Sequence, residues 1–88
     1  MQEVMSLNQN FSIYSTNGNY ISYGIMSGKE RFSLYNLSGN YIAYGIFVDK
    51  QTCNIYDSNN GQRVQYGILN GINMSIYDNN GNYVAYTS

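Results

Sequence analysis

The residue types that most often carry catalysis are scarce in this 88-residue chain. It contains no His, one Cys at position 53 and five carboxylates, so its spacing fits neither a zinc site nor an EF-hand loop. Asp57 and Asp78 each follow a Tyr at the start of a predicted turn, where Asp usually caps the backbone. Cys53 has no partner for a disulfide and is expected to be a buried, unreactive thiol. We therefore predict no catalytic residue, no metal site, no cofactor and no enzymatic activity.

Tyrosine is the residue type most able to form a binding site here. The chain holds 11 Tyr and no Trp, and Tyr and Arg are typical anchors of protein interfaces. The pair of Tyr56 and Arg63 is also expected to make a cation–π contact. Four cross-strand pairs on one face of the predicted sheet form the candidate protein-binding site: Tyr14 with Tyr20, Tyr35 with Tyr41, Tyr56 with Arg63, and Tyr77 with Tyr83.

An internal repeat sets the spacing of these residues. The segment Phe11-Ser12-Ile13-Tyr14 recurs in similar form from Phe32, from Cys53 and from Met74, and these starts are 21 residues apart. Such a period indicates tandem copies of one structural unit. The sequence therefore divides into an N-terminal segment, residues 1–10, and one repeat domain, residues 11–88, made of repeats 11–31, 32–52, 53–73 and 74–88.

Each repeat has the pattern of a β-hairpin. Its halves alternate in period two, are rich in Tyr, Ile and Val, and flank an Asn-Gly or Ser-Gly pair, which is typical of a hairpin turn. The expected fold is all-β, an antiparallel meander of eight short strands. The pattern leaves an open twisted sheet and a small closed barrel as alternatives. An open sheet would have free edges at residues 11–14 and 83–86 and would favour a homo-oligomer.

The register within each hairpin follows from the loop length. A two-residue loop at Asn17-Gly18 would pair Ile13 with Ser22 and mix apolar and polar residues on one face. A three-residue loop at 16–18 instead pairs Ile13 with Ile21 and places Gly18 where a G1 bulge needs it. We predict the second register, with a four-residue loop in the third repeat. The other pairs expected from the same logic are Phe11 with Tyr23, Ile25 with Phe32, Ile46 with Cys53, and Ile68 with Met74.

The predicted sheet has an apolar face and a tyrosine face, which requires Ile13 and Ile21 to lie on the same side. Gly24, Gly45 and Gly67 fall on the tyrosine face, where a neighbouring ring would cover the bare backbone. The apolar face is expected to form the core from Phe11, Ile13, Ile21, Tyr23, Ile25, Phe32, Leu34, Ile42, Tyr44, Ile46, Cys53, Ile55, Val64, Tyr66, Ile68, Met74, Ile76, Val84 and Tyr86.

The unit resembles the MORN-type repeats, in particular their bacterial antitoxin-like variety. The shared pattern is a Tyr followed by Gly after four and ten residues, as in Tyr14…Gly18…Gly24 and Tyr35…Gly39…Gly45. With one extra loop residue it recurs as Tyr56…Gly61…Gly67, and a further Gly follows at positions 28 and 71. The resemblance covers residues 11–88 and implies stacked β-hairpins with a non-enzymatic binding or immunity role.

The charge pattern limits the classes of partner. Charged residues make up 10% of the chain and the net charge is −1, so we expect neither nucleic acid nor an anionic membrane as a partner. The N-terminal residues Met1–Leu7 lack the basic and apolar regions of a signal peptide, and the cytoplasm is the expected location.

We therefore predict a protein-binding module, immunity-like or inhibitory, that uses the tyrosine rows. One alternative is a structural protein whose hairpins join edge to edge into an oligomer or fibre. A second is a glycan-binding repeat module that stacks sugars on the tyrosines.

Overall fold

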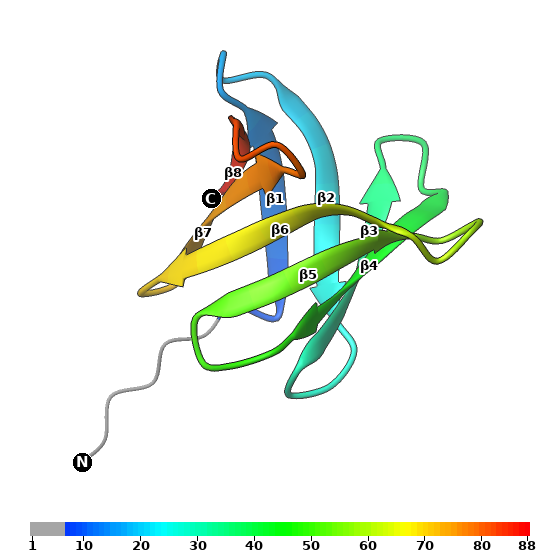
Figure 1. Ribbon diagram of the computed structural model, residues 1–88. Helices are drawn as coiled ribbons and strands as arrows, with labels where there is room; N and C mark the ends of the chain where they lie inside the picture. Colours follow the sequence, from blue (N-terminus) through cyan, green and yellow to red (C-terminus); the bar gives the residue numbers. More distant parts are fainter. Residues whose placement is uncertain (1–6) are drawn as a thin grey trace.

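The computed structural model describes residues 7–88, and its regular structure in that range consists of β-strands alone (Figure 1). Each strand pairs antiparallel with the next one along the chain, and the last pairs with the first, so the sheet closes into a barrel. The predicted all-β meander is confirmed, and of the two alternatives the chain adopts the closed one. The strands are β1 (Asn10–Ser15), β2 (Tyr20–Met26), β3 (Arg31–Asn36), β4 (Tyr41–Phe47), β5 (Thr52–Asp57), β6 (Arg63–Asn70), β7 (Asn73–Asp78) and β8 (Tyr83–Thr87).

Closure joins the two strands that are farthest apart in the sequence. Tyr14 of β1 lies opposite Tyr86 of β8, and the backbones of Ser12 and Ser88 donate hydrogen bonds to each other over 3.1 and 2.9 Å. The two terminal strands, which an open sheet would leave as free edges, therefore pair with each other through residues 12–15 and 85–88.

The four hairpin loops have the predicted lengths and lie at one end of the barrel. Gly18 has a φ of 89°, the left-handed conformation expected of the G1 position. The predicted capping by Asp is also confirmed, because Asp78 Oδ1 accepts hydrogen bonds from the amides of Asn80 and Asn82 over 2.9 and 3.0 Å. These bonds, that from Asn82 above all, lower the pKa of the Asp78 carboxyl.

The predicted register holds at the loop and fails beyond it. Tyr14 pairs with Tyr20 as expected, but a β-bulge follows, and past it Ile13 pairs with Ser22. The predicted pair of Ile13 and Ile21 is therefore wrong. The other hairpins contain the same bulge, and every connection is shifted by one residue. The predicted pairs are replaced by Phe11 with Gly24, Met26 with Phe32, Phe47 with Cys53, and Leu69 with Met74.

The predicted division of the sheet into an apolar face and a tyrosine face is wrong for the even-numbered strands. Ile13 is 3% exposed and belongs to the core, whereas Ile21 is 44% exposed on the outside of the barrel. The odd-numbered strands carry the core as predicted, with Phe11, Ile13, Phe32, Leu34, Cys53, Ile55, Met74 and Ile76 all buried. The residues wrongly assigned to the core, all half-buried or exposed on the outer face, are Ile21, Tyr23, Ile25, Ile42, Tyr44, Ile46, Val64, Tyr66, Ile68 and Tyr86.

The physical reason is the small volume inside a barrel of eight strands, which side chains fill completely. The odd-numbered strands contribute large side chains along most of the barrel, so the strands between them contribute small ones there. Larger side chains of the even-numbered strands pack into the core only near the ends of those strands, as Leu69 does in β6. At Gly45, a Cβ atom would overlap the ring of Phe32. The inward-facing small residues are Ser22, Gly24, Ala43, Gly45, Gly67 and Ala85.

The repeated glycines are thus covered from inside the barrel. The rings of Phe11 and Phe32 lie against Gly24 and Gly45, and Met74 lies against Gly67. The prediction that these glycines lie on the tyrosine face, under its rings, is wrong. Their role is to leave space for the core residue of the neighbouring strand.

The chain before the first repeat also takes part in the barrel. Leu7 is buried in the core, and Gln9 Nε2 donates a hydrogen bond to the carbonyl of Met26 over 2.9 Å. Residues 1–6 lie outside the described residues. They include most of the segment Met1–Leu7, from which the absence of a signal peptide was predicted.

Candidate functional site

All eleven tyrosines lie on the outside of the barrel, where they form four clusters that we call the tyrosine belt. In the cluster around Tyr35, the ring of Tyr23 stacks on it at 5.4 Å with an interplanar angle of 15°, and the ring of Tyr41 lies 5.9 Å away on the other side. Each cluster joins one hairpin to the preceding one, and the cluster that contains Tyr14 and Tyr86 closes the ring between β8 and β1. The clusters are Tyr20–Tyr14–Tyr86, Tyr41–Tyr35–Tyr23, Tyr56–Tyr44 and Tyr83–Tyr77–Tyr66.

The structure places all eight predicted site residues in or beside this belt. The three tyrosine pairs are in contact as expected, with ring centroids 5.6 Å apart for Tyr14 and Tyr20. Tyr56 and Arg63 are paired in the register. The guanidinium of Arg63, however, lies 5.4 Å from the centroid of Tyr66, so its aromatic partner differs from the predicted Tyr56.

Sequence reasoning missed four members of the belt, namely Tyr23, Tyr44, Tyr66 and Tyr86, because it placed them in the core. A signal was present in three of them, since a Gly follows each of Tyr23, Tyr44 and Tyr66. A glycine that makes room for a core side chain must face inward, and its neighbour in the strand must then face outward.

Apolar side chains extend the aromatic surface. At each bulge two successive residues face outward, so Ile21 is exposed beside Tyr20, and Ile42 beside Tyr41. Tyr20, Tyr41 and Tyr83 are themselves 45–50% exposed. The outside of the barrel therefore combines exposed rings and aliphatic side chains, on a chain with few charges.

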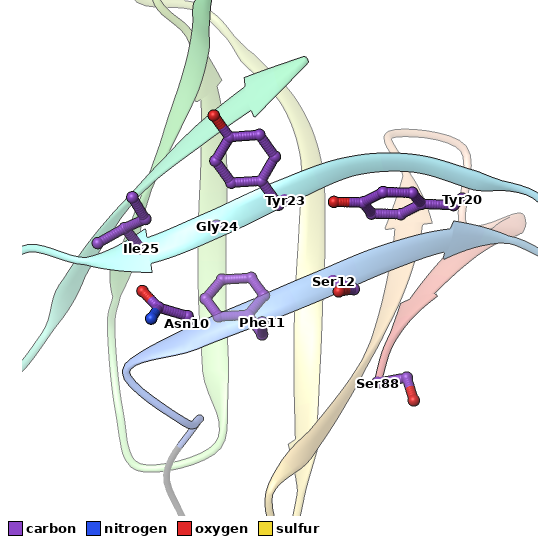
Figure 2. A pocket seen from close by; sticks show the side chains of 8 residues that line it. All are labelled: Asn10, Phe11, Ser12, Tyr20, Tyr23, Gly24, Ile25 and Ser88. Carbon is purple, nitrogen blue, oxygen red and sulfur yellow. The ribbon is translucent and has the colours of Figure 1, made fainter. Parts of the chain in front are cut away.

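A hollow of about 480 Å³ lies on this outer surface across β1 and β2. Figure 2 shows Asn10 and Ser12 on β1, and Tyr20, Tyr23 and Ile25 on β2, around the backbone of Gly24. Ser88 borders the hollow from beyond the end of β8. All the side chains that line it are neutral, so it offers aromatic faces together with hydroxyl and amide groups.

The only thiol lies in the core, away from this surface. Cys53 is fully buried, with its Sγ 3.4 Å from the Sδ of Met74, and burial raises the pKa of the thiol to about 12. Since the thiolate is the nucleophile, we expect Cys53 to stay unlabelled by a thiol-specific reagent at pH 8 and to react fully in guanidinium chloride. Labelling of the folded chain at the rate of the unfolded chain would contradict the assignment.

Within residues 7–88, no group of three Cys, Asp or Glu side chains is close enough to hold a metal ion. The same range contains no helix with the length and apolar character needed to cross a membrane.

No family model, no curated protein and no solved structure matches the chain. The resemblance to MORN-type repeats therefore stays a prediction that depends on the motif alone.

Proposed function

We propose that this protein is a non-enzymatic binding module that captures another protein through the tyrosine belt, in an immunity-like or inhibitory role. The observation that carries the proposal is the outward placement of rings and aliphatic side chains on a barrel whose interior is already filled. Tyr41 and Ile42 are both exposed and contribute nothing to the core. An exposed apolar and aromatic surface of this kind usually marks an interface.

The belt suits a protein partner better than a nucleic acid or a second copy joined edge to edge. A net charge of −1 gives no attraction for the phosphates of a nucleic acid. Assembly of hairpins edge to edge would need free strand edges, and β1 and β8 are paired with each other. Partly exposed tyrosines provide large contact areas that lose little conformational entropy on binding. We place the interaction in the cytosol, where a free thiol such as that of Cys53 is stable.

The test replaces two exposed rings of the belt. Tyr41→Ser combined with Tyr83→Ser removes rings that are half exposed, so the fold should persist. A partner is first captured by the unaltered chain from a lysate of the native host and identified by mass spectrometry. Its affinity for the double variant should then fall at least about tenfold, since truncation of a tyrosine anchor commonly costs more than about 1 kcal/mol.

The control replaces exposed apolar residues of similar accessibility at the other end of the barrel. Val48→Ser combined with Ile72→Ser alters side chains of the connections β4–β5 and β6–β7, which are 60% and 54% exposed. This variant should keep its affinity for the partner. Equal binding by the belt variant and the unaltered chain, or a loss confined to the control, would contradict the proposal.

A further inference from the structure

Two of the four hairpins hold an arginine over an outward tyrosine. In the second hairpin, the guanidinium carbon of Arg31 lies 5.7 Å from the centroid of the Tyr44 ring. In the third, that of Arg63 lies 5.4 Å from the centroid of the Tyr66 ring. Tyr44 and Tyr66 occupy the same position of their repeats, each just before the inward glycine of the second strand. In both hairpins, therefore, the space over this outward tyrosine is occupied by a guanidinium group of the same chain.

The first hairpin has the same tyrosine but no such cation. Asn10 stands where the second hairpin has Arg31, since Asn10 pairs with Ile25 just as Arg31 pairs with Ile46. Tyr20 stands where the third hairpin has Arg63. The space in front of Tyr23 is the hollow described above, which Asn10 and Ser12 border from β1 (Figure 2).

The remaining walls of the hollow match the arginine sites. Arg63 Nη1 donates a hydrogen bond of 3.2 Å to Asn54 Oδ1, and Ser12 holds the position of Asn54 in the first hairpin, with a hydroxyl oxygen as acceptor. The side chain of Asn10 offers a second oxygen. The equivalent site in the fourth hairpin lacks an aliphatic side chain on one side, because Ser88 stands there at the position of Ile25.

We infer that the hollow over Tyr23 binds the guanidinium of an arginine side chain presented by the partner protein. The inference rests on the proposed function and assigns a chemical feature to the partner. A tyrosine ring attracts a cation to its face, and a guanidinium is planar and weakly hydrated, so it stacks there without losing much solvation. The lining side chains carry no positive charge that would repel it.

The first experiment titrates the chain with a blocked tripeptide, acetyl-Gly-Arg-Gly-amide, and with its citrulline counterpart, while amide chemical shifts are recorded. Citrulline has the shape of arginine without its charge. The arginine peptide should shift the signals of Tyr23 and Gly24, and the citrulline peptide should bind about two- to fivefold more weakly, the ratio expected of an exposed cation–π contact. Equal binding of both peptides, or no shift at these residues, would overturn the inference.

Two reciprocal variants make the test specific. Asn10→Arg should let the chain fill its own hollow, as Arg31 does in the second hairpin, and abolish the shifts at Tyr23. Arg31→Asn should open a second site, so that the arginine peptide also shifts the signals of Tyr44. Asn10→Gln is the matched control and should leave binding intact. Unchanged shifts at Tyr23 in Asn10→Arg would overturn the inference.

Partner capture separates this inference from the proposed function. If Asn10→Arg captures the partner with unchanged affinity while the belt variant loses it, the arginine site is refuted and the binding role stands. If Asn10→Arg weakens capture at least about twofold and Asn10→Gln does not, the partner's arginine is supported. Binding of the arginine peptide at Tyr23 with no protein captured would support the guanidinium site and refute the proposed function.

Discussion

Replacing Gly45 with Val should destabilise the barrel by about 3 kcal/mol or more, because the new side chain would enter the space of the Phe32 ring. A Cβ atom at Gly45 already lies within 3.0 Å of three ring carbons of Phe32, and the ring has no free space because it is fully buried. The loss is a large part of the stability of a domain this size, roughly 4–13 kcal/mol. Urea denaturation followed by circular dichroism measures it.

A compensating change distinguishes steric overlap from a general intolerance of substitution. Gly45→Ala combined with Phe32→Leu should be more stable than the sum of the two single changes predicts, by at least about 1 kcal/mol, because the smaller side chain vacates the overlapped space. Gly28→Ala is the control, since a Cβ there meets no atom within 4 Å, and it should change stability by less than about 1 kcal/mol. Additive effects in the pair would refute the account of the core.

The second large effect concerns two isoleucines on neighbouring strands. Ile13→Asp should cost about 4 kcal/mol or more, because it buries an unpaired carboxyl among apolar side chains. Ile21→Asp should cost less than about 1 kcal/mol, since Ile21 lies at the bulge and is 44% exposed. Thermal unfolding of both variants beside the unaltered chain gives the comparison. Similar losses in the two variants would mean that both residues are buried and that the bulge is absent.

The local features of this fold could be predicted from the sequence. The period, the Asn-Gly turns and the loop lengths are encoded within single repeats, and so is the pair of Tyr14 and Tyr20 next to the turn. All these features depend on residues close together in the chain. For the same reason the capping role of Asp78 was also predictable.

The faces of the even-numbered strands could not be predicted from hydrophobic alternation. In β2 one alternating set is Ser22, Gly24 and Met26, and the other is Ile21, Tyr23 and Ile25; the second is far more hydrophobic. The structure nevertheless turns the first set inward, since the volume left by the neighbouring strands decides the matter. Hydrophobic alternation reports only which face of a single strand prefers burial, whereas the space available inside the barrel depends on the side chains of all eight strands.

The candidate site could likewise be predicted only in part, because some of its contacts join different hairpins. The sequence indicated eight of its residues through cross-strand pairing, but the stacking of Tyr23 on Tyr35 joins two hairpins and depends on the corrected faces. The hollow over Tyr23 is a difference between repeats. Asn10 stands at the position of Arg31 and Tyr20 at that of Arg63, and the role of these two arginines over a tyrosine ring is visible only in the structure.

The pairing of β1 with β8 has a consequence for how the chain is made. Tyr14 and Tyr86 are separated in the sequence by the whole meander, so this contact has the greatest loop-closure cost in the barrel. During synthesis on the ribosome, β1 emerges before β8, and one edge of β1 stays unpaired until β8 has also emerged. In that interval its backbone is a template on which a strand of another nascent chain can add. Folding yield should therefore depend on how many copies are being translated close together.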